Sequence, residues 1–237
     1  MLETVFAQII PLTVAMALPK PVLKATRYLL HGRPILHSVL LILTWGLSLF
    51  IVLYSCTAAG ILIKEVTASK WTYDIPYSVE NWIHVIVGLA FIVLGMKKLQ
   101  ENLTKTKKKV STDHISVTLF SVIRSVLILE FFSIKNTLLI LLIVNILMRD
   151  ELPLKQLSIA TGLISLTAML WISMPLLAYF LAGHKRNMIL ELFKAWLMEH
   201  KNVLIIFIYI FIGISSLSSG LGSLMASVLE SIYKTVS

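Results

Sequence analysis

The chain has 237 residues, of which 57% are hydrophobic and only 14% are charged, and its formal net charge is +9. The mean hydropathy of +0.88 and several long apolar runs are typical of a protein that crosses the membrane several times, and they exclude an ordinary soluble domain. The single cysteine excludes a disulfide framework and any zinc or redox site built on paired cysteines.

The first apolar stretch is too short to cross a membrane. Val5 to Leu18 would form a helix of about 21 Å, whereas the hydrocarbon layer is about 30 Å thick. Pro19 and Pro21 end this helix, because proline lacks an N–H and clashes with the preceding turn. Lipid cannot bond to the carbonyls that the break sets free, so the break is expected to face protein or a water-filled cavity.

A basic stripe follows the break. Lys20, Lys24, Arg27 and His31 recur at steps of four, three and four residues, which places them on one face of a short helix. Two interpretations are open. The stripe is either a plain cytoplasmic anchor or a surface that binds anionic headgroups or a phosphorylated substrate.

The next two segments complete the first half of the chain. Ile35 to Ile63 contains no Asp, Glu, Lys or Arg and is predicted to be the second span, and Trp82 to Met96 the third. Residues 99–113 are rich in lysine and are typical of a cytoplasmic linker. We therefore expect one transmembrane domain with two three-helix halves, residues 1–98 and 114–237.

The fourth apolar segment, Ile115 to Met148, is interrupted by Ser133-Ile134-Lys135-Asn136. Two broken helices in corresponding halves are the best sequence pointer to the substrate site of a transporter. The sequence therefore predicts that the two breaks lie together at such a site.

Three more helices are predicted after this segment. Leu157 to Leu181 is the fifth span, His184 to Lys201 an amphipathic helix at the membrane surface, and Val203 to about Val228 the sixth span. The last span carries a small-residue face that is expected to pack closely on another helix. Its members are Gly213, Ser215, Ser219, Gly220, Ser223 and Ser227.

The basic residues alternate between the links that join the spans. Fourteen of the 21 Lys and Arg residues fall in the first, third and fifth links, so the positive-inside rule places those links in the cytoplasm and both termini on the other side. The predicted fold is an all-α integral membrane protein with six transmembrane helices, arranged as two inverted three-helix repeats with broken first and fourth helices. The charge needs no nucleic-acid partner to explain it.

Ionisable side chains inside the predicted membrane segments are the leading functional candidates, because charges at that depth are costly and usually pair or mark an ion or substrate path. They are Arg124, Glu130 and Lys135. Glu130 would carry the proton if export is proton-coupled; alternatively, Glu130 and Lys135 neutralise each other. The sequence has no phosphate-binding loop, HExxH motif or nucleophile elbow, so we expect no enzyme, no cofactor and no metal.

Several short motifs resemble one transporter superfamily. Ile10-Pro11-Leu12, the helix end at Pro19-Lys20-Pro21 and Trp45-Gly46 resemble the start of the lysine-exporter (LysE) superfamily. The stretch from Pro175 to Gly183 and the later Ile212-Gly213 and Gly220-Leu221 are similar to its GAP branch, named for addressing glycolipids and peptidoglycolipids to the cell surface. Relatives tend to have Asn-Pro-Lys-Asn at the second break. This chain keeps Lys135 and Asn136 there but lacks the proline.

The resemblance implies a six-span exporter of the plasma (inner) membrane that forms a homodimer, with a central site lined by Pro19, Pro21, Lys135 and Asn136. The residues alone add Lys20, Lys24, Arg124 and Glu130 as candidate substrate-binding groups. We favour translocation of a lipid or glycolipid-type amphiphile from the cytoplasmic side, with membrane lipids and anionic headgroups as partners. A proton-coupled exporter of an amino acid or ion, and a scaffold for lipid export that does not itself transport, are the alternatives.

Overall fold

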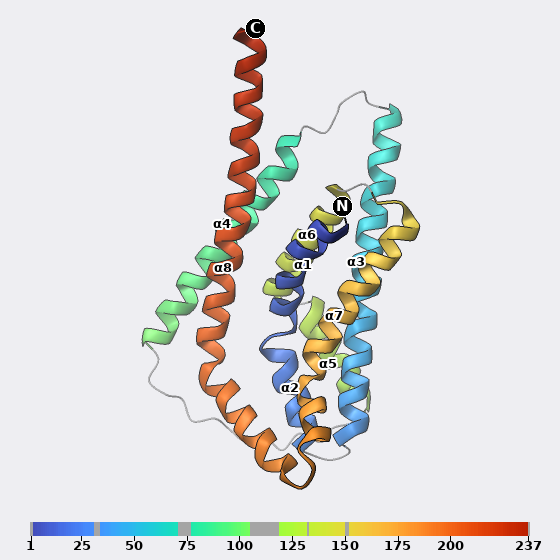
Figure 1. Ribbon diagram of the computed structural model, residues 1–237, viewed down its shortest axis with the longest axis vertical. Coiled ribbons are helices and arrows are strands. Elements are labelled where there is room, and N and C mark those ends of the chain that lie inside the picture. Colours follow the sequence, from blue (N-terminus) through green and yellow to red (C-terminus); the bar gives the residue numbers. More distant parts are fainter. Residues whose placement is uncertain are drawn as a thin grey trace.

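Figure 1 shows the computed structural model, in which almost every described residue is helical and none is in a strand. The structure describes the chain except for residues 1, 31–33, 71–76, 105–118, 132, 150–151 and 237. Within the helices, it leaves out the side chains of residues 2–7, 34, 64–70, 77–80, 119, 129–131, 227–228 and 230–236.

The helices come in the same order in both halves of the chain: two short helices separated by a break, then two long ones. The first set is α1 (Leu2–Ala17), α2 (Lys20–Leu30), α3 (Pro34–Lys70) and α4 (Tyr77–Thr104). The second is α5 (Leu119–Phe131), α6 (Ile134–Arg149), α7 (Leu154–Leu181) and α8 (Arg186–Val236), with a 3-10 turn, η1 (Gly183–Lys185), before α8. Both predicted breaks are present, whereas an inverted symmetry between the halves stays a prediction.

Four helical segments of the described chain are long and apolar enough to cross a membrane: Ile35–Ile63, Asn81–Thr104, Leu154–Leu181 and Gly183–Ala226. The pair α1 and α2, bent by 44° at the break, would make a fifth. The predicted count of six is not confirmed. The reason lies in the fourth segment, where α5 and α6 have only 13 and 16 residues and would each rise about 20 to 24 Å.

Two predicted boundaries also differ from the structure. The amphipathic stretch from His184 to Lys201 and the last span are not separate helices. After the 3-10 turn that contains His184, α8 runs unbroken over 51 residues from Arg186 through the rest of the stretch and the span. No proline or turn signal separates the two patterns, so the backbone ladder continues where the side-chain pattern changes. The predicted linker at 99–113 begins inside α4, which ends at Thr104, and the rest of it lies outside the described residues.

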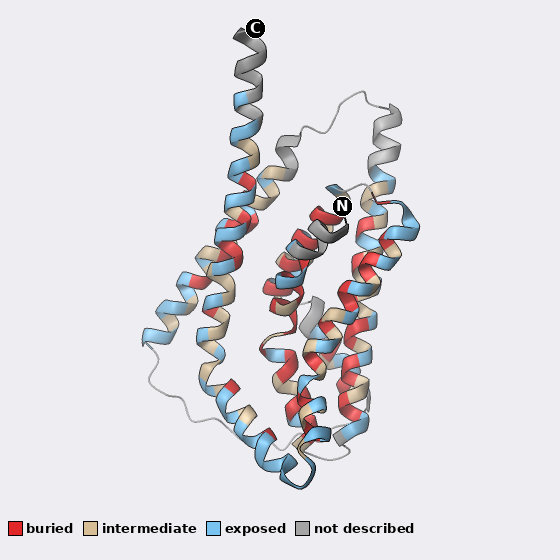
Figure 2. Cartoon of the chain, viewed as in Figure 1, coloured by how far each residue is buried: buried red, intermediate tan, exposed pale blue. Residues whose placement is uncertain are grey.

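The buried sides of α1 and α6 lie together in the core, and α3 and α7 pack around them (Figure 2). Ile9 and Met16 of α1 and Leu139 and Ile143 of α6 are fully buried in one apolar cluster, which α3 and α7 extend. A second cluster surrounds Trp45 of α3. The buried faces of α1 and α6 are therefore shielded from lipid by protein, as unpaired backbone groups at a break require.

Helices α4 and α8 form an antiparallel pair beside this core (Figure 1). Glycines make the contact close: a Cβ atom on Gly88 would lie 2.9 Å from the carbonyl oxygen of Gly213, and one on Gly220 would lie 2.8 Å from that of Asn81. The predicted small-residue face is thus correct for the glycines of α8. It is wrong for Ser215 and Ser219, whose side chains are exposed beside the core rather than buried against α4.

We expect Gly88→Ala to lower the free energy of unfolding by about 1–3 kcal/mol, because the added methyl group would push backbone away from backbone. Gly222→Ala is the matched control on α8, since a Cβ atom there meets nothing within 4 Å. It should be neutral or slightly stabilising, as alanine favours helix. Thermal unfolding in detergent measures both, and equal melting temperatures for the two variants would contradict the close contact.

Candidate functional site

The break between α1 and α2 follows from its two prolines. Leu18 still donates its N–H to the carbonyl of Val14 at 3.1 Å, and the ladder resumes where Leu23 donates to the carbonyl of Pro19 at 3.0 Å. Proline 19 has no N–H to offer the carbonyl four residues earlier, which belongs to Ala15. A buried carbonyl at this position therefore needs a donor from elsewhere in the protein.

Lys135, in the first turn of α6, supplies that donor. Its Nζ donates hydrogen bonds of 2.6 Å to the carbonyl oxygens of Ala15 and of Leu18, and the residue is only 8% exposed. A positive charge at the C-terminal end of α1 also complements the helix dipole. The two breaks therefore meet, and the lysine of the second satisfies the backbone that the proline of the first leaves open.

The second break is closed locally by its own backbone. Thr137 donates its N–H to the carbonyl of Ser133 at 3.0 Å, which restarts the ladder at the beginning of α6. Asn136, next to Lys135, is 3% exposed. The second break has no proline. In the sequence, its position is indicated by the polar residues Ser133 and Asn136 instead.

A pocket of about 380 Å³ opens beside the first break, between α2 on one side and α4 and α8 on the other. Five of its lining residues carry a positive charge. The lining consists of Pro19, Lys20, Leu23, Lys24, Arg27, Lys98, Lys201, Asn202 and Ile205. We call it the basic pocket. All five charges have the same sign and lie around one cavity, so an anion that enters the pocket is attracted by each of them.

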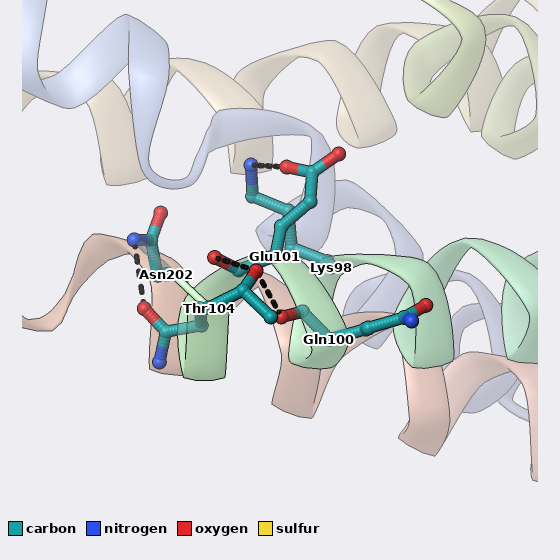
Figure 3. A network of polar contacts seen from close by, with 6 residues as sticks. Lys98, Gln100, Glu101, Thr104 and Asn202 are labelled. Carbon is teal, nitrogen blue, oxygen red and sulfur yellow. Dashed lines mark hydrogen bonds and ion pairs between the residues drawn. The ribbon is translucent and has the colours of Figure 1, made fainter. Parts of the chain in front are cut away.

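The wall formed by α4 and α8 is fixed by polar contacts (Figure 3). Lys98 forms an ion pair of 3.0 Å with Glu101, one turn further along α4. Asn202 of α8 donates a hydrogen bond of 3.0 Å to the side-chain oxygen of Asn102. These contacts hold Lys98 and Asn202 in place at the rim of the basic pocket.

A second pocket, of about 300 Å³, lies in the same interface, between α1 and α6 on one side and α4 and α8 on the other. None of the described residues that line it is Lys, Arg, Asp or Glu. Its polar groups are those of Gln8, His84, Ser215, Ser216 and Ser219. We call it the uncharged pocket.

The structure separates the predicted site residues into groups. Pro19, Lys20 and Lys24 line the basic pocket together with Arg27, so three residues of the predicted basic stripe face a cavity. The fourth, His31, lies outside the described residues. Pro21, Lys135 and Asn136 are buried at the breaks and line neither pocket. Whether these residues bind substrate stays a prediction.

The two other intramembrane charges are not brought to the pockets. Arg124 is exposed on α5 and lines neither of them. The side chain of Glu130 lies outside the described residues, so the suggested neutralisation of Lys135 by Glu130 is untested.

Sequence reasoning did not assign Lys98 and Lys201 to a site. The distribution of positive charge was the available signal, because it placed the first, third and fifth links on one side of the membrane. The basic pocket takes Lys20, Lys98 and Lys201 from those three links in turn. What the charge count could not show is that they share a single cavity.

Comparison with known proteins identifies one family. The model of the SfLAP family, described as Sap, sulfolipid-1-addressing protein, matches residues 9–222. No curated protein and no solved structure matches the chain. The matched range includes both breaks and both pockets except Gln8.

Proposed function

The chain belongs to the SfLAP family of sulfolipid-1-addressing proteins, and from that premise we propose that it moves an anionic lipid or glycolipid-type amphiphile across the membrane. The family and the apolar helices support a membrane protein that addresses lipids. Membership of the wider lysine-exporter superfamily and assembly as a homodimer remain predictions of the resemblance.

One observation carries the proposal: five cations from three separate links converge on one pocket beside a broken helix. Basic pockets between transmembrane helices on the cytoplasmic side are a recognised way to bind anionic headgroups. By the positive-inside rule, this end of the molecule faces the cytoplasm in the inner membrane. The headgroup would enter from the cytoplasmic leaflet, while the apolar chains stay in lipid.

The broken helix explains why the pocket can reach membrane depth. Non-helical backbone is tolerated there only where it is buried in protein or lines a cavity. Lys135 donates hydrogen bonds to the carbonyls of Ala15 and Leu18 at the break, and Pro19 of the same break lines the basic pocket. The break can thus border the pocket without exposing unpaired carbonyls to lipid.

Transfer of labelled lipid tests the proposal. Purified protein is reconstituted in phosphatidylcholine vesicles with a trace of phosphatidylglycerol or phosphatidylcholine that carries a fluorophore on an acyl chain, and dithionite reports movement between leaflets. We expect transfer of phosphatidylglycerol and not of phosphatidylcholine. Lys20→Gln/Lys24→Gln should slow transfer about 30-fold, at about 1 kcal/mol for each charge.

Lys155→Gln/Lys185→Gln is the matched control, because it removes two exposed lysines that line neither pocket. It should transfer lipid at the wild-type rate. Equal rates for all three proteins would contradict a role for the basic pocket. A purified protein that transfers no lipid would instead favour the scaffold alternative.

A further inference from the structure

The two pockets lie along one interface. In each, one wall is the α4–α8 pair and the other is the broken helix with its neighbours, α2 for the basic pocket and α6 for the uncharged pocket. Along α8, Asn202 of the basic pocket and Ser215 of the uncharged pocket are 13 residues apart, a rise of about 20 Å. This is about two thirds of the thickness of a 30 Å hydrocarbon layer.

The uncharged pocket holds donors and acceptors without fixed charge. Ser216 donates a hydrogen bond of 2.8 Å to the backbone carbonyl of His84, which joins α8 to α4 at the pocket wall. Ser215 and Ser219 are exposed on the same helix and leave their hydroxyl groups at the pocket surface. Phe211 at the pocket edge is 53% exposed, so the pocket borders the lipid-facing surface.

We propose that the interface between α4–α8 and the broken helices is the path of the headgroup, and that the uncharged pocket is its second binding site on that path. The inference rests on the proposed function and adds the route. Serine hydroxyls and the His84 imidazole replace part of the water around the anionic headgroup oxygens. They hold these oxygens less strongly than five cations do, and a site on a path must be weak enough for its occupant to leave.

The apolar chains need no cavity on this path. Because the uncharged pocket borders the lipid-facing surface at Phe211, the chains remain in lipid while the headgroup moves along the interface. The ligand class is therefore an amphiphile with a small anionic headgroup, and an amphiphile of any chain length would fit.

Filling the uncharged pocket separates binding from transfer. Ser215→Trp places an indole in this pocket, at a rise along α8 of about 15 Å from Ile205, the nearest residue of that helix in the basic pocket. We expect it to leave the affinity for dioctanoyl phosphatidylglycerol in detergent within about twofold of wild type, while overpacking slows transfer of fluorophore-labelled phosphatidylglycerol between leaflets about tenfold or more. Ser218→Trp is the matched control, since Ser218 is exposed on α8 and does not line the pocket, and it should behave as wild type.

Ser219→Phe fills the same pocket one turn further along α8 and serves if Ser215→Trp does not fold. Wild-type transfer by either folded variant would overturn the path, even with the proposed function intact. A wild-type protein that binds the lipid but does not transfer it would also overturn the path. If the wild-type protein neither binds nor transfers phosphatidylglycerol, the proposed function fails as well.

Discussion

Lys135→Met is expected to lower the free energy of unfolding by about 3 kcal/mol or more. The substitution replaces lysine by an unbranched side chain that is one atom shorter, and it removes both hydrogen bonds to the carbonyls of Ala15 and Leu18. A hydrogen bond to a charged group contributes about 1.5–3 kcal/mol, and a buried carbonyl left without a donor costs its full desolvation. In a chain of this size, the loss corresponds to a melting temperature lower by about 6 °C or more.

Lys155→Met is the control for this substitution, because Lys155 is exposed near the start of α7. Melting in detergent, followed by tryptophan fluorescence, compares the two variants with the wild type. Limited proteolysis near residues 15–20 gives a second, local readout, since the break should open first when its donor is lost. Should Lys135→Met melt with the wild type but lose lipid transfer, the lysine would act on substrate, as the sequence resemblance implies.

The first break could be predicted from the sequence because its cause is local. Two prolines end a helix wherever they stand, and an apolar stretch of 14 residues is too short to span. The same holds for the basic face of α2, which needs only helical spacing. The second break could be predicted too, from Lys135 and the polar residues beside it. The sixth span is a separate matter, because α5 and α6 are each too short to confirm it.

The contacts between distant segments could not be predicted. Lys135 and Ala15 are 120 residues apart, and the acceptor is a backbone carbonyl, which leaves no signal in the residue type. A charge within an apolar segment is interpreted by default as a functional group or as part of an ion pair. Sequence reasoning therefore does not identify a lysine whose role is to donate hydrogen bonds to backbone carbonyls. Lys98 and Lys201 were likewise interpreted as ordinary positive-inside residues, because only the antiparallel packing of α4 on α8 brings them to one pocket.

Reversing two charges of the basic pocket should weaken the binding of anionic lipid by about three orders of magnitude. Lys24→Glu/Lys201→Glu changes one residue of α2 and one of α8, and the five positive charges of the pocket become three positive and two negative. The net charge of the lining thus falls by four units. At about 1 kcal/mol for each unit near the membrane surface, the loss is about 4 kcal/mol, or about 1,000-fold in affinity.

The control is Lys155→Glu/Lys185→Glu, which has the same net charge as Lys24→Glu/Lys201→Glu. Its two substitutions lie at exposed positions outside both pockets. Calorimetric titration with dioctanoyl phosphatidylglycerol compares the two at about 0.1 M and about 1 M salt, where the Debye length falls from about 10 Å to about 3 Å. Wild-type affinity should fall with salt, and the control should follow it. If both double variants lose the same affinity, the attraction comes from the overall charge of the protein, and the convergence of α2, α4 and α8 on one pocket has no part in it.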